Sequence, residues 1–256
     1  RTQRKVFISY RRDDATGVAN QLFEQLSHRG YWVFLDTASI DSGVDFQDAL
    51  WARMADVDLL VFLDTPRALS SRWVYQELAR AHNLGLGVLQ LVWPGHSRTR
   101  GTELCDVIEL QNSDFEDSRP ERLSRLLPAC IDRAAERAEK ARIISLGKKR
   151  SRIVSDMVDK VEEAGLDAAV NPVGPITIFR NRMEVGAAIP FVGVPDAPSI
   201  QQQERGLRPE ELKRYRGIYN GLGIDPEWSD HLGWLNEHHN LRTEQVDQIE
   251  DWLKTL

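Results

Sequence analysis

Short apolar runs recur through the first half of the chain, separated by longer amphipathic or polar stretches. There are five of them, at residues 6–10, 31–35, 58–63, 88–93 and 107–110. Each is a nearly continuous series of hydrophobic residues, which is typical of strands that are covered on both faces. Because such strands alternate here with helical stretches, the pattern predicts an α/β fold with a doubly wound, mostly parallel five-stranded sheet.

Between these strands, apolar residues recur at the spacing of an α-helix. The first predicted helix starts at a cap, Asp13 or Asp14, and ends at Gly30. Its apolar face is expected to carry Val18, Leu22, Phe23 and Leu26. Residues 37–45 have the composition of a loop, and a further helix is predicted over residues 71–84.

The character of the chain changes after the fifth strand. Residues 119–150 interleave Arg and Glu with apolar positions and predict a closing helix that runs into a connector; the apolar positions are Leu123, Leu126, Leu127, Ile131 and Ile144. A helical pattern restarts at Ser151, and strands are predicted at residues 176–179 and 189–194, with the remainder helical. We therefore expect a first domain over residues 1–132, a helical connector over 133–150 and a smaller α/β or α+β domain over 151–256.

Composition narrows the classes of protein to consider. The net charge of −6 gives no overall reason to expect binding to nucleic acid or to a membrane. Cys105 and Cys130 are the only cysteines, and no Cys/His cluster has metal-ligand spacing, so we expect a cytoplasmic protein without disulfides or a metal site. No apolar run approaches the length of a membrane span. The sequence begins at Arg1 rather than methionine, which leaves a preceding leader open.

The basic run at residues 148–152 has two interpretations. Such a run is usually a solvated face of a helix, and contact with an anionic ligand or nucleic acid is the alternative.

A site is expected where the strand order of an open parallel sheet reverses, beyond the carboxyl ends of the strands. If the order is 2-1-3-4-5, this point lies between the first and third strands. Tyr10, Arg11 and Arg12 follow the first strand, and residues 64–72 follow the third. The acid at the end of the second strand is Asp36. An aromatic ring, arginines and acids should therefore converge on one crevice.

Trp73 and Glu77 are four residues apart on the helix predicted after the third strand, so they share a face. A tryptophan on a helix is more often a core residue than a pocket residue, and a single glutamate is usually a solvated surface acid. The expected crevice shifts this balance for Glu77, because the helix that carries it begins there.

Several segments resemble the TIR (Toll/interleukin-1 receptor) domain in its bacterial form. These segments are residues 6–10, residues 33–36, the loop from Ile40 to Phe46 with its Gly43, and the stretch from Ser70 to Leu78. They occur in the family's order, and the resemblance covers residues 4–130, about half of the chain. The resemblance implies a flavodoxin-like sheet. It also implies NAD cleavage, because many TIR domains cleave NAD with a glutamate in a Trp-x-x-x-Glu pattern, here Trp73 to Glu77.

Other site residues follow from the same resemblance. Tyr10 matches the aromatic position of the pocket wall, and Tyr10, Arg11, Asp36, Ser70 and Trp73 are the candidate contacts to NAD. The segment 37–48 matches the loop after the second strand, which covers the site and mediates contacts between TIR domains, with Ile40, Gly43 and Phe46 as the assembly residues.

The chemistry needs few groups. NAD carries a cationic leaving group, so breaking its glycosidic bond requires mainly stabilisation of an oxocarbenium-like ribose, which one carboxylate can provide. Asp36 is a candidate helper or a plain strand-end cap; Arg11 or Arg12 is a partner for the pyrophosphate or a surface arginine. NAD is then a substrate, and no cofactor is expected. TIR domains that act only as adaptors typically lack the acid, and the sequence leaves hydrolysis and cyclisation open.

Residues 151–256 carry no family resemblance. Ser199 and Asp196 at a helix start are candidates for binding a phosphate or nucleotide on free backbone N–H groups, with charge from Arg180, Arg182 or Arg205; a plain helix cap is the alternative. The histidines at positions 231, 238 and 239 are interpreted as packing and surface residues. Bacterial TIR domains are commonly joined to modules that sense a cyclic nucleotide signal in antiphage defence, and an oligomerising module is the other interpretation.

Overall fold

The computed structural model describes residues 4–35, 56–68, 79, 81, 84–99, 105–221, 224 and 226–256. The chain divides into two compact units, of which one ends at Leu146 and the other begins at Gly147. This boundary lies inside the segment 133–150, where the sequence predicts a connector.

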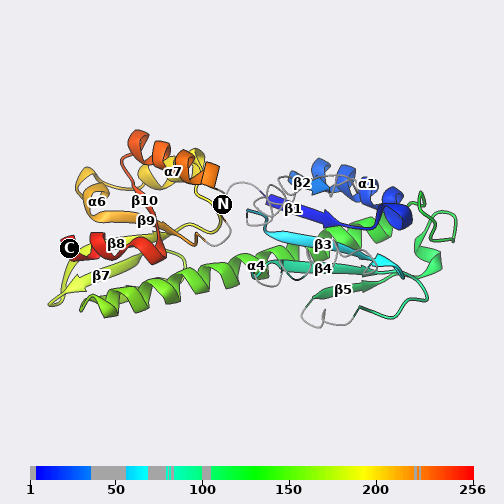
Figure 1. Cartoon of the computed structure of the whole chain (residues 1–256), viewed down its shortest axis with the longest axis horizontal. Coiled ribbons are helices and arrows are strands. Elements are labelled where there is room, and N and C mark those ends of the chain that lie inside the picture. The colour runs from blue at the N-terminus through cyan, green and yellow to red at the C-terminus, as the bar shows by residue number, and fades with distance from the viewer. Residues whose placement is uncertain are drawn as a thin grey trace. The chain divides into compact units, whose positions relative to one another are not determined.

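The first unit contains a five-stranded parallel sheet in the order β2-β1-β3-β4-β5 (Figure 1). Its strands are β1 (Arg4–Ser9), β2 (Tyr31–Leu35), β3 (Leu59–Asp64), β4 (Gly87–Val92) and β5 (Asp106–Glu109). Every residue of β3 is buried, which explains the uninterrupted apolar run at residues 59–63. The predicted strand order and the flavodoxin-like sheet are therefore confirmed.

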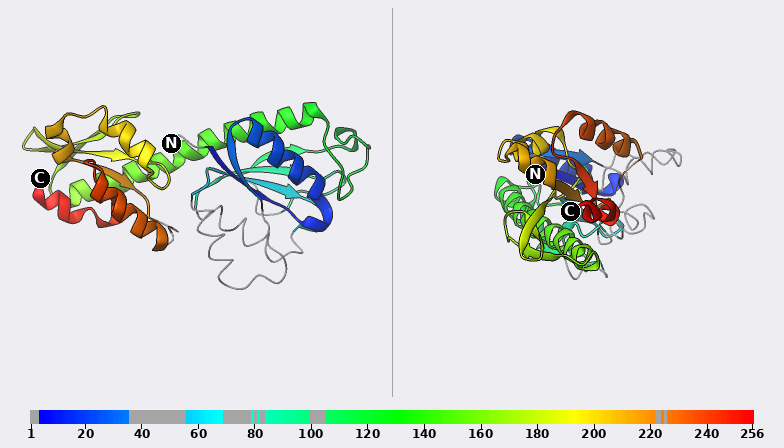
Figure 2. Two further views of the ribbon diagram at one scale, coloured as in Figure 1. Left: turned by 90° about the horizontal axis from the view of Figure 1, so that it is seen from above. Right: turned by 90° about the vertical axis from the view of Figure 1, so that its left-hand side faces the viewer.

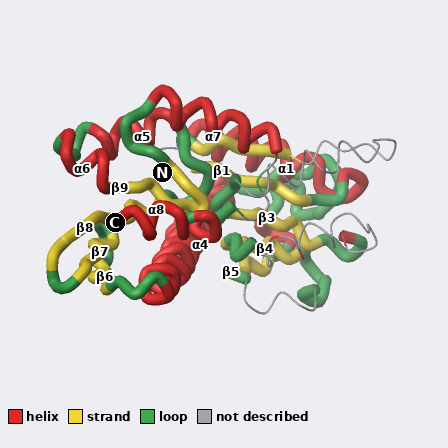
Figure 3. The backbone as a smooth tube through the Cα atoms, turned by 60° about the vertical axis from the view of Figure 1, so that its left-hand side comes forward, coloured by secondary structure: helices red, strands yellow, loops and turns green. Residues whose placement is uncertain are grey.

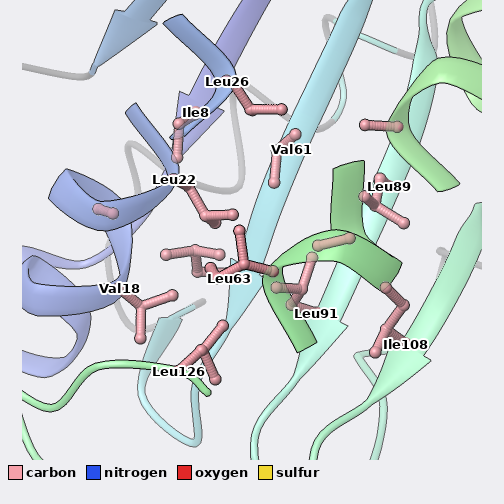
Figure 4. Packing of buried hydrophobic residues seen from close by; sticks show 14 of the residues in the cluster. Ile8, Val18, Leu22, Leu26, Val61, Leu63, Leu89, Leu91, Ile108 and Leu126 are labelled. Carbon is pink, nitrogen blue, oxygen red and sulfur yellow. The ribbon is translucent and has the colours of Figure 1, made fainter. Parts of the chain in front are cut away.

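Two helices cover one face of this sheet, α1 (Arg12–His28) and the first part of α4 (Pro128–Glu163). Figure 4 shows Val18, Leu22 and Leu26 of α1 packed with residues of the strands and of the loop before α4. Phe23 does not belong to this face, because it is 38 % exposed. Successive helical residues point about 100° apart, so a residue next to buried Leu22 is turned toward solvent. The opposite face of the sheet has its own core, with Phe7, Leu60, Phe62 and Val88 among its members.

The closing helix differs from the prediction at both ends. Residues 115–127, after the short 3₁₀ helix η2 (Asn112–Asp114), are not helical, and α4 begins at Pro128, a residue suited to a helix start. Leu123 is consequently exposed, and Ile144 is half exposed on α4. There is no restart at Ser151, which lies inside α4; Figure 2 shows this helix as one continuous ribbon. Gly165, at φ 73°, follows its end as expected.

The second unit is built on a mixed sheet in the order β10-β9-β8-β7-β6. Its strands are β6 (Asp167–Val170), β7 (Ile176–Arg180), β8 (Met183–Pro190), β9 (Tyr215–Tyr219) and β10 (Thr243–Gln245). The first three are antiparallel neighbours, and β8, β9 and β10 are parallel. The strand predicted at 189–194 is wrong in position, because β8 ends at Pro190, and β6, β9 and β10 were not predicted.

Helices cover both faces of the second sheet (Figure 3). The last part of α4 and α8 (Glu250–Thr255), which follows the 3₁₀ helix η3 (Val246–Gln248), pack on one face. On the other face lie α5 (Ala197–Glu204), α6 (Pro209–Arg214) and α7 (Pro226–His238). This arrangement confirms a second, smaller domain of mixed helix and strand. None of the helices in the described ranges combines the length and apolar character needed to cross a membrane.

Candidate functional site

The segments that leave the carboxyl ends of β1 and β3 meet at the point where the strand order reverses. β1 and β3 are neighbours, and α1 begins directly after β1. The Thr65 hydroxyl donates a hydrogen bond of 3.0 Å to the Asp14 carboxylate, and Arg67 forms an ion pair with the other oxygen of that carboxylate. The first turn of α1 is thereby fixed to the segment after β3.

Arg11 is part of the same cluster. Its guanidinium lies 3.3 Å from Asp13 and 3.7 Å from Asp14, and donates to the Arg67 carbonyl over 3.4 Å. The charge of Arg11 is therefore balanced within the protein. The sequence predicted Asp14 only as a helix cap, whereas the structure uses its carboxylate to join two segments that are 51 residues apart.

Tyr10 is buried, with 7 % of its surface exposed. It belongs to the core under α1 and α4, together with Val6 and Ile8 of the preceding strand β1. This position follows from the alternation of side chains along β1, where Phe7 faces the opposite core.

The other predicted site residues lie outside the described part of the chain. These are Asp36, Ser70, Trp73 and Glu77, and the assembly residues Ile40, Gly43 and Phe46. Two described residues lie before and after these candidates in the sequence. Leu35 pairs with Ile8 of β1, and Ala81 is fully buried in the core on the opposite face of the sheet.

A buried polar network that the sequence did not predict lies at the carboxyl ends of β3 and β4. The Asp64 carboxylate is fully buried and accepts hydrogen bonds from Gln90 Nε2 at 2.7 Å and from His96 Nε2 at 3.1 Å. The Thr99 hydroxyl and backbone N–H donate to it at 2.7 and 3.0 Å. Arg98 Nε extends the network by donating to Gln90 Oε1 over 3.0 Å.

This network holds the loop after β4 against the edge from which the segment carrying Trp73 and Glu77 departs. The Asp64 carboxylate thus joins β3 to β4 and to the loop after it. One signal was available in the sequence: Gln90 interrupts an apolar strand, and a buried polar side chain requires a partner.

The predicted anion site of the second unit has the geometry of a helix cap. Ser199 donates its backbone N–H to the Asp196 carboxylate over 2.8 Å, and the Ser199 hydroxyl bonds the backbone of Asp196 in return. Arg180 lies at the hairpin between β7 and β8, opposite Met183, whereas Asp196 follows the far end of β8. At about 3.3 Å per residue, β8 separates these two regions by roughly 20 Å. Arg180 is therefore not brought together with Asp196 and Ser199.

The remaining candidates of this unit have structural contacts. His231 and His238 form a row with Trp234 along α7, with ring centroids 5.9 and 4.2 Å from that of Trp234, as expected for packing residues. Arg150 of the basic run donates to the carbonyl oxygens of Asn171, Pro172 and Gly174. It therefore fixes a loop of its own unit.

Comparison with known proteins identifies the first unit. Residues 6–127 match the family model described as TIR domain, and the match ends one residue before α4 begins. No curated protein sequence matches the chain. The first unit thus contains a TIR domain, as the resemblance predicted, and such a domain supports TIR-type signalling, adaptor function or NAD cleavage in general.

Proposed function

We propose that the TIR domain cleaves the nicotinamide–ribose bond of NAD and that Glu77 is its catalytic carboxylate. The observation that carries the proposal is the pattern Trp73-x-x-x-Glu77 in the segment after β3 of a TIR domain, in a sheet whose order reverses between β1 and β3. Ligands of such sheets bind at this edge.

The described residues around the segment support this position. Ala81 is buried against the sheet, and on the helix predicted over 71–84 a residue four positions earlier shares its face. A helix that follows a parallel strand begins at the carboxyl edge of the sheet, so an earlier residue lies closer to that edge. On the helix that the sequence predicts, Glu77 would thus share a face with Ala81 and come earlier in the helix.

The proposed chemistry uses the charge of one carboxylate. As the bond to nicotinamide breaks, positive charge develops on the ribose, and Glu77 stabilises it and holds the ribose hydroxyls. Asp36, Ser70 and Trp73 are proposed as further contacts to NAD. Arg11 and Tyr10 are proposed on the β1 side, where Arg11 has to exchange part of its pairing with Asp13 to bind the pyrophosphate.

The test is an NAD incubation of purified protein with identification of the products. Glu77→Gln should reduce nicotinamide release by at least about 100-fold, because it removes the charge that stabilises the transition state. Glu24→Gln is the matched control, since Glu24 is a half-exposed acid on α1 of the same domain. Equal activity of the two variants would refute the role of Glu77. Linear ADP-ribose would indicate hydrolysis, and a cyclic product would indicate a cyclase.

We further propose that self-association of TIR domains switches the enzyme on and that residues 151–256 provide the trigger, as in an antiphage-defence effector. A TIR protein that self-associates without consuming NAD would instead be a non-catalytic adaptor or scaffold. Product analysis before and after assembly separates these two outcomes.

A further inference from the structure

A cavity of about 510 Å³ lies in the second unit, away from the cap at Asp196. It is lined by Pro209, Leu212, Lys213, Arg216, Asn240 and Arg242. Its lining thus contains three cationic side chains, one amide and two apolar side chains, and no carboxylate. Its volume is within the range of about 300–1,000 Å³ that small-molecule sites have.

The three cations come from three different segments. Lys213 belongs to α6, Arg216 to β9, and Arg242 directly precedes β10. Gly217 pairs in register with Thr243 and donates its N–H to the Arg242 carbonyl over 2.8 Å. Arg216 and Arg242 each lie one position before this pair, so the two residues are neighbours on adjacent parallel segments.

Four acids of the surrounding elements are directed to groups outside this cluster: Glu184 to the Tyr215 hydroxyl, Glu204 to the backbone N–H groups of Asn240 and Leu241, and Glu210 and Glu211 to Arg208. In the described part of the chain, neither Lys213 nor Arg242 has a carboxylate within 4.0 Å. Only Arg216 is paired, with Glu244 at 3.1 Å.

Arg216 is held in a fixed orientation. Besides the ion pair with Glu244, its guanidinium donates to the Tyr215 carbonyl over 3.0 Å and lies over the Trp252 ring, 5.5 Å from its centroid. The side chain is 16 % exposed. A guanidinium already fixed by its neighbours loses little conformational entropy when it binds an anion.

We propose that this cavity binds a small phosphate-bearing molecule with at least two negative charges. Lys213, Arg216 and Arg242 bind the phosphate oxygens, the Asn240 amide donates to them, and Pro209 and Leu212 contact the organic part. Arginine and lysine are the usual partners of phosphate, and convergent like charges are stabilised when an anion lies between them. This site does not depend on the proposed NAD cleavage.

A second cavity of the same unit provides a comparison. Its volume is about 610 Å³, and its charged lining is predominantly acidic, with Asp156, Asp159, Glu163 and Asp247 against Arg152 and Lys160. Because carboxylates repel phosphate, size alone does not select the proposed site; its charge does.

The test is calorimetric titration of the full-length protein with inorganic pyrophosphate, AMP and ADP at low ionic strength. We expect saturable binding that weakens with salt. Arg242→Gln and Lys213→Gln should each weaken binding at least about tenfold, because each removes a charge-assisted contact. Arg180→Gln is the matched control: it removes the same charge from an exposed position of the same unit and should leave affinity unchanged.

Lys213→Arg keeps the charge and should bind like wild type, which separates loss of charge from loss of fold. Absence of saturable binding to all three probes would overturn the proposal. An equal loss of affinity in Arg180→Gln would also overturn it. A loss of affinity in Glu77→Gln but not in Arg242→Gln would overturn it too, because that result would assign binding to the TIR domain. Tighter binding of a duplex oligonucleotide, lost in the same variants, would instead define a nucleic-acid surface.

Discussion

Gly17 allows the backbone of α1 to contact the loop before α4. A Cβ atom at this position would lie 2.4 Å from backbone atoms of Leu123 and Ser124, and the Gly17 N–H donates to the Arg122 carbonyl over 2.8 Å. Gly17→Ala should therefore lower the free energy of unfolding by about 1–3 kcal/mol, because backbone atoms must move apart. Gly147→Ala is the counterpart, since nothing lies within 4 Å of its Cβ position in α4. It should raise stability by about 0.5–1 kcal/mol. Urea unfolding checks both values, and a shift of the same sign in both variants would contradict the argument.

Substitution of Asp64 should lower the free energy of unfolding more than substitution of its partner His96 in the polar network. Asp64→Asn replaces an acceptor by an amide N–H₂ that must face the donors of Gln90 or Thr99, so the free energy of unfolding should fall by about 2 kcal/mol. His96→Gln should have a smaller effect, because the His96 side chain is 20 % exposed and water can replace its contact. Urea denaturation of the two variants gives the comparison, and a larger loss for His96→Gln would refute this order.

At the scale of elements, α4 is attached to the first sheet by an ion cluster with a calculable pH dependence. Glu139 accepts hydrogen bonds from Arg142 at 2.9 and 3.0 Å and from the Tyr31 hydroxyl, and Arg142 chiefly lowers the pKa of Glu139 from 4.5 to about 2. A lowered carboxyl pKa stabilises the fold above pH 4.5, and this stabilisation is lost as the pH falls toward 2.

The expected outcome is a smaller acid sensitivity in Glu139→Gln than in wild type. Between pH 6 and 3, the wild type should lose about 1 kcal/mol more than the variant, a value that allows for the partial solvent exposure of Glu139. Glu136→Gln is the control, because Glu136 is exposed on the same helix. Urea unfolding as a function of pH provides the measurement. Identical pH profiles for Glu139→Gln and wild type would exclude the cluster as the source.

The helices and strands differ in how well the hydrophobic pattern of the sequence predicts them. The strands of the first sheet were predicted to within two residues because burial on both faces makes them continuously apolar. β6 is largely exposed and β9 contains Arg216 and Gly217, so neither has that pattern. The reversal point followed from strand order, but the Asp64 network did not, since it joins residues up to 35 positions apart through hydrogen bonds that leave no periodic pattern. The proposed phosphate cavity was missed for a related reason: its cations come from three separate segments.

At the scale of the whole molecule, assembly of TIR domains should control activity. Trp32 supports a contact surface on the first unit, because it lies on the edge strand β2 and is 54 % exposed beside Phe34. If the proposed assembly is correct, NAD cleavage per molecule should rise steeply with protein concentration, and Trp32→Ala should weaken this rise without unfolding the domain. Light scattering and nicotinamide release, measured together, test this. Activity proportional to concentration in a monomeric protein would exclude the mechanism.

Control by the second unit can be tested by dividing the chain at the observed boundary. α4 contributes Ala134, Ala138 and Ala141 to the core of the first unit, and Ile153 and Met157 to that of the second. A fragment ending at Leu146 therefore keeps the part of α4 that the TIR core needs. A trigger that binds the second unit activates only by favouring the assembled state, and moving a population from 1 % to 99 % active requires about 5.5 kcal/mol of differential binding.

Fusing an oligomerising domain to residues 1–146 supplies this free energy without the second unit. We expect the fused fragment to cleave NAD with no added ligand, and the same fusion carrying Glu77→Gln to be inactive. Light scattering and circular dichroism should establish that both proteins are folded and oligomeric. If the fused fragment is folded and oligomeric yet inactive, while the full-length protein cleaves NAD, then the second unit supplies part of the active site and is not only its regulator.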